Sequence, residues 1–293
     1  MEQNTQQYVL QNESLTVTVA AKGAELISVK RDGIEYIWQG DPRYWEEHAP
    51  IMFPICGRLW EGKYTYGGKT YEMGLHGFAR QSVFSVKHAT RDRISLYLIP
   101  NEEIRAQYPF EFALLVEYWI RGDRLFAEYT VRNNGERVMY AAIGAHPGFA
   151  VPIAGEGDFS DWYLEFENEI SPDVMQLSGS FTTGKKYGMT PEGGRRLPLT
   201  RALFDHEGVF FNRADTGVTL RSDRSSHSVS LHHNAPYFGL WQPAKTEPPF
   251  LCLEPWSGFA GYEGEIAQLE TKPDMYHIQP HSEEAFSYSI VFR

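Results

Sequence analysis

Short runs in which apolar and polar residues alternate, separated by turn residues, fill most of the chain. Alternation with a period of two is typical of antiparallel strands that have one face in water. Leu15, Val17 and Val19 are an example, and Asp32-Gly33 and Gly67-Gly68 predict hairpins within 26–38 and 64–73. The pattern predicts further strands at 83–88, 94–99, 112–120, 124–132, 138–143, 162–167, 217–221, 227–232, 238–241, 250–254 and 286–292. Helical patterns are few and short, at 41–47 and 101–107.

No linker, charge run or repeat of fixed period divides the 293 residues, so we expect a single domain over residues 1–293. Strands this numerous cannot lie in one flat sheet. The sequence therefore predicts an all-β fold with few short helices, built from stacked antiparallel sheets in a large β-sandwich or closed into a barrel. The alternation alone leaves both arrangements open.

The charge balance excludes several partners. The chain has 27 Lys and Arg against 38 Asp and Glu, a formal net charge of −11, and no basic patch that would bind nucleic acid or an anionic membrane. The N-terminal segment lacks the features of a secretory signal, and no apolar run reaches the roughly 18 residues of a membrane span. We expect a cytoplasmic protein, monomeric or homodimeric, in which Cys56 and Cys252 are reduced.

Several motif matches fail on inspection. Residues 179–185 resemble a phosphate-binding loop, but Lys186 stands where a Ser or Thr is needed and no helical pattern follows. The sequence contains no GxGxxG, GxSxG or HExxH motif. His232 and His233 are adjacent on a predicted strand, so their side chains point to opposite faces. The sequence therefore predicts a protein that uses neither a cofactor nor a metal ion.

Two of four unusual segments present a cation or an imidazole beside glycine. Arg58 follows an apolar run that contains two prolines, which disfavour a central strand. Such an arginine either makes a buried ion pair or presents its guanidinium to a polar ligand. His76 precedes Gly77 just after a predicted hairpin, where backbone can approach a ligand closely. A structural histidine remains the alternative there.

The other two segments carry groups suited to proton transfer. His146 precedes Pro147, which favours an extended conformation at the end of a strand, and an imidazole titrates near neutrality. Glu254 directly follows an apolar strand, where burial would raise its basicity as a general base requires. The alternative is an ion pair with an arginine such as Arg58. Upstream, Trp241 and Gln242 are candidates to stack on a sugar ring and to bind its hydroxyls.

In this order, the four segments resemble motifs of the aldose 1-epimerase (galactose mutarotase) superfamily, and most of all its LacX-like branch. They are Gly57-Arg58, His76-Gly77-Phe78, His146-Pro147-Gly148-Phe149 and Glu254-Pro255-Trp256, and the resemblance runs from about residue 15 to 292. It implies a β-supersandwich fold and a cofactor-independent isomerase that interconverts the α and β anomers of an aldohexose. It also implies Glu254 as the general base, His146 as the general acid, and Arg58 and His76 as residues that hold and polarise the sugar.

Three alternatives remain beside this hypothesis. A non-catalytic sugar-binding or sugar-sensing protein would keep the cleft but has no need of an acid–base pair. A glycoside hydrolase needs a second carboxylate, for which Asp158, Asp205 and Glu263 are available. A mutarotase for hexose 6-phosphates needs cations around the phosphate, and Arg80, Lys185 or Arg213 could supply them.

Overall fold

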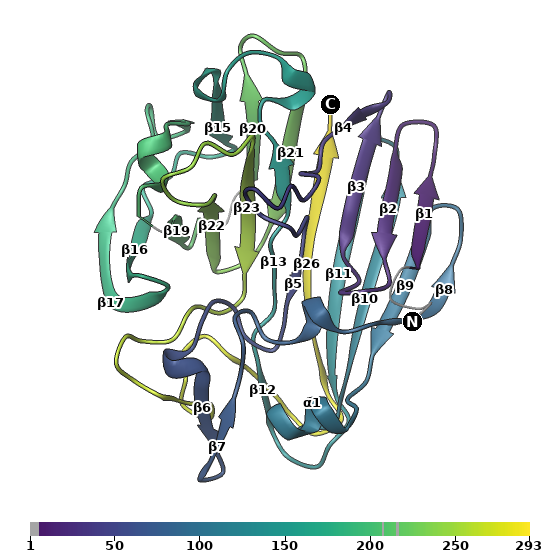
Figure 1. Cartoon of the computed structure of the whole chain (residues 1–293), viewed down its shortest axis with the longest axis vertical. Coiled ribbons are helices and arrows are strands. Elements are labelled where there is room, and N and C mark those ends of the chain that lie inside the picture. The colour runs from purple at the N-terminus through teal and green to yellow at the C-terminus, as the bar shows by residue number, and fades with distance from the viewer. Residues whose placement is uncertain (1–5, 207, 215–216) are drawn as a thin grey trace.

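The computed structural model describes residues 6–206, 208–214 and 217–293 and is built almost entirely from β-strands (Figure 1). A nine-stranded sheet carries the most regular strands. Its order is β18 (Arg196–Pro198), β15 (Trp162–Phe166), β20 (Val218–Ser222), β21 (Ser228–His233), β26 (Glu283–Phe292), β11 (Arg124–Asn133), β10 (Phe112–Arg121), β9 (Arg93–Leu98) and β8 (Ser85–Ala89).

A second large sheet has eight strands. Its order is β17 (Phe181–Gly188), β16 (Asp173–Ser178), β19 (Val209–Asn212), β22 (Tyr237–Trp241), β23 (Phe250–Trp256), β13 (Gly144–Ala145) and β5 (Ile51–Met52), with β14 (Gly148–Ala150) also paired to β23. Buried residues of both sheets, such as Leu220 and Leu253, belong to one continuous hydrophobic core. The predicted all-β sandwich is therefore confirmed.

Three smaller sheets complete the fold. The four-stranded sheet β1 (Gln7–Gln11), β2 (Thr16–Ala20), β3 (Leu26–Arg31), β4 (Ile34–Glu35) lies beside β8–β11 in Figure 1 and shares the same core. Strands β12 (Met139–Ala141) and β25 (Tyr276–Ile278) form a pair, and β24 (Ala267–Gln268) joins the hairpin of β6 (Lys63–Tyr66) and β7 (Lys69–Glu72). Among the strands described, only β24 and β6 pair in parallel.

Helices are short, as predicted. The helix expected at 101–107 is α1 (Glu102–Gln107), and the side chain of Asn101 caps it by accepting from the Ile104 amide. Within the described residues, five 3-10 turns span Trp60–Gly62, Ala79–Gln81, Ile153–Gly155, Phe159–Asp161 and Arg201–Phe204. None of the helices in the described ranges is long and apolar enough to span a membrane.

The helix predicted at 41–47 is wrong. This segment makes one turn, in which the amides of Tyr44 and Trp45 both donate to the Asp41 carbonyl. The helix does not continue, because the amides of His48 and Ala49 donate to the carboxylate of Glu25. A local amphipathic pattern cannot reveal a distant acceptor that captures the backbone.

Candidate active site

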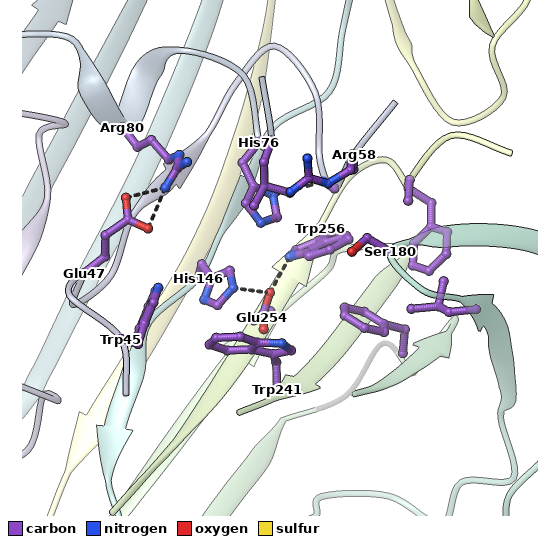
Figure 2. Close-up of a pocket in the computed structure, with 16 residues that line it drawn as sticks. Trp45, Glu47, Arg58, His76, Arg80, His146, Ser180, Trp241, Glu254 and Trp256 are labelled. Carbon is purple, nitrogen blue, oxygen red and sulfur yellow. Dashed lines mark hydrogen bonds and ion pairs between the residues drawn. The ribbon is translucent and has the colours of Figure 1, made fainter. Parts of the chain in front are cut away.

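A cavity of about 210 Å³ opens over the eight-stranded sheet, and five of the six predicted site residues line it (Figure 2). These five are Arg58, His76, His146, Trp241 and Glu254. They come from segments up to about 200 positions apart, and the antiparallel pairing of β23 with β22, β13 and β14 brings most of them together. Gln242 is not among the lining residues.

Glu254 lies in β23, in which every residue is buried. Its side chain is fully buried, and its Oε2 accepts a hydrogen bond from Trp256 Nε1 at 3.1 Å. The opposite position on β22 is Gly239, where a Cβ would lie 2.6 Å from the ring of Phe210 and 3.2 Å from the Glu254 Cβ. Glycine at this position thus leaves room for the side chains of Phe210 and Glu254. Burial raises the pKa of Glu254 well above its ordinary value.

His146 follows β13 and points at Glu254. The distance from its Nε2 to Glu254 Oε2 is 3.1 Å, and its side chain is 7% exposed. Burial, reinforced by the charge of Arg80, lowers the pKa of His146 to about 3. Burial therefore favours the uncharged form of both groups, the neutral imidazole and the protonated carboxyl.

Each member of the pair keeps one polar atom without a partner in the described part of the chain. These atoms are His146 Nδ1 and Glu254 Oε1, and both are buried. Buried polar atoms in native proteins are nearly always hydrogen-bonded, so an orphaned pair beside a cavity indicates a ligand site. The predicted alternative, an ion pair between Glu254 and Arg58, is wrong, because Glu254 pairs with His146.

His76 is fixed as a hydrogen-bond donor toward the cavity. The Gly57 amide donates to its Nδ1 at 3.0 Å, and an amide can only donate, so the proton of the neutral ring resides on Nε2. Burial, with the charges of His146, Arg80 and Arg58, lowers the pKa of His76 well below its ordinary value. The loop is tight, since a Cβ at Gly77 would lie 2.1 Å from the Phe53 carbonyl oxygen.

Tryptophan side chains line the other walls. Trp241 and Trp45 contact each other and the imidazole of His146, with ring centroids 5.3 Å (Trp241) and 4.9 Å (Trp45) from it. Trp256 packs against His76 at 5.6 Å. Arg58 is exposed at the cavity edge. The residue before it is Gly57, and a Cβ added at that position would lie only 2.8 Å from the Cβ of Ala260.

The structure places Gln242, predicted to bind sugar hydroxyls, outside the cavity lining. Its side chain is buried away from the cavity lining and accepts a hydrogen bond from Arg201 Nη1 at 2.7 Å. The same guanidinium nitrogen donates to the Pro248 carbonyl at 2.9 Å. Consecutive residues of a strand point to opposite sides, so Trp241 and Gln242 could not both face the cavity.

One feature of the site, an ion pair between two of the lining residues, does not follow from the sequence pattern. Glu47 and Arg80 line the cavity and form an ion pair in which Arg80 Nη1 lies 2.6 Å from each carboxylate oxygen (Figure 2). Glu47 lies in the segment predicted as a helix, and no local pattern links it to Arg80. Asp158, Asp205 and Glu263 do not line the cavity, and neither do Lys185 and Arg213.

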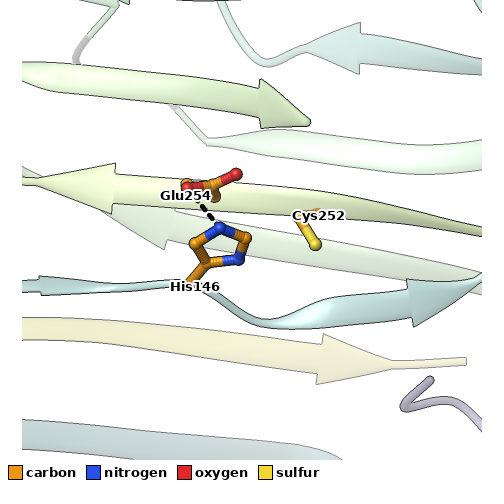
Figure 3. Close-up of side chains that lie close together, drawn as sticks. All are labelled: His146, Cys252 and Glu254. Atoms are coloured by element: carbon orange, nitrogen blue, oxygen red, sulfur yellow. Dashed lines mark ion pairs between the residues drawn. The ribbon is translucent and has the colours of Figure 1, made fainter. Parts of the chain in front are cut away.

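His146, Cys252 and Glu254 could together hold a metal ion (Figure 3). One ligand atom from each lies within 4.8 Å of the other two. Thiolate is the ligating form of cysteine, but burial, followed by the charge of Glu254, raises the pKa of Cys252 well above its ordinary value. Burial likewise favours the protonated form of the Glu254 carboxyl, because it raises the pKa of that group. This donor set therefore favours protonated ligands over bound metal.

Comparison with known proteins identifies the family of this chain. Residues 6–288 match the family model described as aldose 1-epimerase. The chain therefore belongs to the aldose 1-epimerase family of isomerases.

The relatives extend this assignment. Protein LacX, in its chromosomal form from Lactococcus lactis subsp. lactis, is 34% identical over 96% of this chain and 97% of its own length. A galactose mutarotase related enzyme from Lactobacillus acidophilus superposes with a TM-score of 0.94 at 32% identity, covering 98% of this chain and 97% of that chain. A galactose mutarotase-like protein from Lactobacillus casei ATCC 334 gives 0.93 at 31% identity, covering 98% and 100%.

Proposed function

We propose that the protein is a mutarotase that interconverts the α and β anomers of an aldohexose, with Glu254 and His146 as its proton-transfer pair. The observation that carries this proposal is the 3.1 Å contact between His146 Nε2 and Glu254 Oε2 in the lining of the cavity, where each group also keeps one buried polar atom without a partner among the described residues. A protein that only binds sugar does not need a buried acid–base pair.

Ring opening requires one proton to leave the C1 hydroxyl and one to reach the ring oxygen. In the reactive form Glu254 is a carboxylate and His146 an imidazolium, which differs from the uncharged form by one proton moved along their contact. Glu254 takes the C1 hydroxyl proton while His146 protonates the ring oxygen, and the bond from C1 to that oxygen breaks. The open-chain aldehyde rotates about its C1–C2 bond and closes on the other face by the reverse transfers.

The burial of the pair suits this cycle. After ring opening Glu254 is protonated and His146 is neutral, the uncharged form that burial favours. The hydrogen bond from Trp256 Nε1 stabilises the carboxylate form in the other half of the cycle. The uncharged pair and the pair of carboxylate and imidazolium are thereby brought closer in free energy. Proton-transfer groups of this kind contribute about 10²–10⁴-fold each to the rate.

The remaining residues hold the sugar. His76 Nε2–H would donate to the ring oxygen or a neighbouring hydroxyl as negative charge develops, and Arg58 would bind a hydroxyl at the cavity edge. Trp241 and Trp45 offer apolar faces for the carbon face of a pyranose. A cavity of about 210 Å³ is smaller than the roughly 300–1,000 Å³ typical for drug-sized ligands, which fits one sugar ring.

Polarimetry of freshly dissolved α-D-glucose and α-D-galactose tests the proposal. We expect the wild type to accelerate the approach to anomeric equilibrium, and Glu254→Gln to lose this acceleration while still folding. No acceleration of any aldose or aldose phosphate by the wild type would overturn the proposal, and sugar binding without acceleration would favour a sugar-binding protein.

A further inference from the structure

The ion pair of Glu47 and Arg80 lies on one side of the catalytic pair, across the cavity from Arg58 and Ser180 (Figure 2). Arg80 Nη1 contacts both oxygens of Glu47 at 2.6 Å. The side chains are only 18% and 29% exposed for Arg80 and Glu47, so solvent weakens their attraction less than at an open surface.

One turn of the fold fixes both partners. Arg80 lies in the 3-10 turn Ala79–Gln81, and its carbonyl oxygen would lie 2.8 Å from a Cβ at Gly23. On the other side, the amides of His48 and Ala49, which follow Glu47 directly, donate to Glu25 at 2.7 and 3.0 Å. Because Gly23 and Glu25 belong to the same turn, this turn holds the segments of both Glu47 and Arg80, through the backbone of Gly23 and the carboxylate of Glu25.

The pair presents hydrogen-bond donors and acceptors together without a net charge. The carboxylate has lone pairs beyond those that Arg80 uses, and the guanidinium has further N–H groups, among them a buried Nε without a partner in the described residues. A sugar hydroxyl donates and accepts at once, so two neighbouring hydroxyls match this arrangement. A phosphate or carboxylate accepts only, and it would be repelled by Glu47 while Arg80 is already neutralised.

We propose that the Glu47–Arg80 ion pair binds two adjacent hydroxyls of the sugar and makes the site selective for neutral aldoses over anionic ones. This inference rests on the proposed mutarotase function and specifies its substrate class. Arg80, named in the sequence analysis as a phosphate ligand, thus serves the opposite selectivity because of Glu47.

The test compares Glu47→Gln with Glu46→Gln, which removes the same charge from the exposed neighbouring residue. Anomer exchange of D-glucose and D-glucose 6-phosphate is measured for each by saturation-transfer NMR, and folding is checked by thermal unfolding. Without its carboxylate partner, Arg80 becomes an unpaired cation. We expect kcat/KM of Glu47→Gln to fall about 10-fold for glucose and to rise for glucose 6-phosphate, with Glu46→Gln unchanged.

Deoxy sugars locate the contact. In the wild type, a substrate that lacks a hydroxyl bound by Glu47 should have a lower kcat/KM than glucose. In Glu47→Gln the loss of the same hydroxyl should lower kcat/KM much less, as in a double-mutant cycle. Two adjacent positions among 2-, 3-, 4- and 6-deoxyglucose should show this loss of coupling. Coupling at no position would contradict the proposed contact.

The selectivity ratio separates this inference from the proposed function. If Glu47→Gln changes the rates for glucose and glucose 6-phosphate by the same factor, or if the wild type prefers the phosphate, the selectivity is wrong while the mutarotase stands. Binding of both sugars, measured by saturation-transfer difference NMR, gives the same ratio without catalysis. A wild type that binds glucose selectively but exchanges no anomer would overturn the function and support the inference.

Discussion

Two glutamates in strands of different sheets have opposite electrostatic behaviour. Glu117 on β10 faces outward from a strand whose residues alternate between buried and half-buried positions. It accepts hydrogen bonds from Ser95 Oγ and Arg93 Nη2, which lower its pKa although partial burial acts in the other direction. Glu254 on β23 is fully buried, its neighbours are an indole N–H and an imidazole, and burial raises its pKa.

The difference shows how the environment of a carboxylate separates a structural role from a chemical one. Glu117 has a permanent cation and a hydroxyl beside it, so its charged form is stabilised and it has no reason to bind a proton. Glu254 lacks a cation and keeps one oxygen unpartnered, which costs stability but raises its basicity. A loss of stability of this kind is expected at a functional site.

The largest expected effect separates the two glutamates by activity. Glu254→Gln should lower kcat/KM for anomer exchange by about 10²–10⁴-fold, because the amide cannot take the C1 hydroxyl proton. The matched variant Glu117→Gln should leave kcat/KM unchanged, since it removes a carboxylate of the outer sheet face. Polarimetry with α-D-glucose measures both, and equal activity of the two variants would refute the assignment.

The second prediction concerns the pH dependence of stability. In Glu254→Gln, His146 retains a pKa near 3 when folded and about 6.5 when unfolded, so the free energy of unfolding should fall as pH decreases below about 6.5. In His146→Asn, Glu254 retains a raised pKa when folded, so this free energy should fall as pH increases above about 4.5. Each slope should approach about 1.4 kcal/mol per pH unit, the value for a difference of one bound proton.

The wild type supplies the control for these slopes. Between about pH 4.5 and 6.5 the unfolded pair carries one titratable proton, on His146, and a folded pair that burial keeps uncharged also carries one, on Glu254, so the two contributions should cancel. Urea unfolding from pH 4.5 to 7.5 measures all three proteins. Slopes of the same sign in both variants would show that burial does not keep these groups uncharged.

A smaller effect is expected from the glycine opposite Glu254. Gly239→Ala places a Cβ against the ring of Phe210 and should destabilise the protein by about 1 to 2 kcal/mol while lowering activity through displacement of Glu254. Gly188→Ala, at an exposed strand end with nothing within 4 Å of a Cβ, should have little effect on either. Thermal unfolding and polarimetry compare the two, and equal destabilisation would contradict the packing.

The smallest effect is expected from metal removal. Dialysis against EDTA should leave the anomer exchange rate unchanged, because Cys252 and Glu254 favour their protonated forms. A loss of activity that Zn²⁺ restores, and that is absent in Cys252→Ser, would instead identify His146, Cys252 and Glu254 as a metal site.

Local pattern predicted most of the fold. Strands with one wet face, such as β10 and β11, follow directly from alternation. The pattern does not predict the hairpin of β16 and β17, because most residues of β17 are exposed and polar. Hydrogen bonding between the two strands defines this hairpin. Very short strands such as β5 and β13 were missed as well, since their pairing with distant partners defines them.

For the site, residues within recognisable motifs were predicted and contacts between distant segments were not. Arg58, His76, His146, Trp241 and Glu254 line one cavity as expected. The tautomer of His76 depends on the Gly57 amide, and the pairing of Arg80 depends on a loop held by Glu25, so neither could be inferred from spacing. Gln242 lies outside the cavity lining, where its side chain accepts a hydrogen bond from Arg201, and its spacing from Trp241 does not reveal this distant partner.

The most direct test of the central claim, that Glu254 and His146 act as one proton-transfer unit, is the anomer exchange rate of glucose by saturation-transfer NMR in Glu254→Gln, His146→Asn and the double variant. Residues that act as a unit are strongly non-additive. We predict that each single variant loses most of the acceleration and that the double variant is no slower than the slower single one. Near-wild-type exchange in either single variant, or losses that multiply in the double variant, would contradict the account.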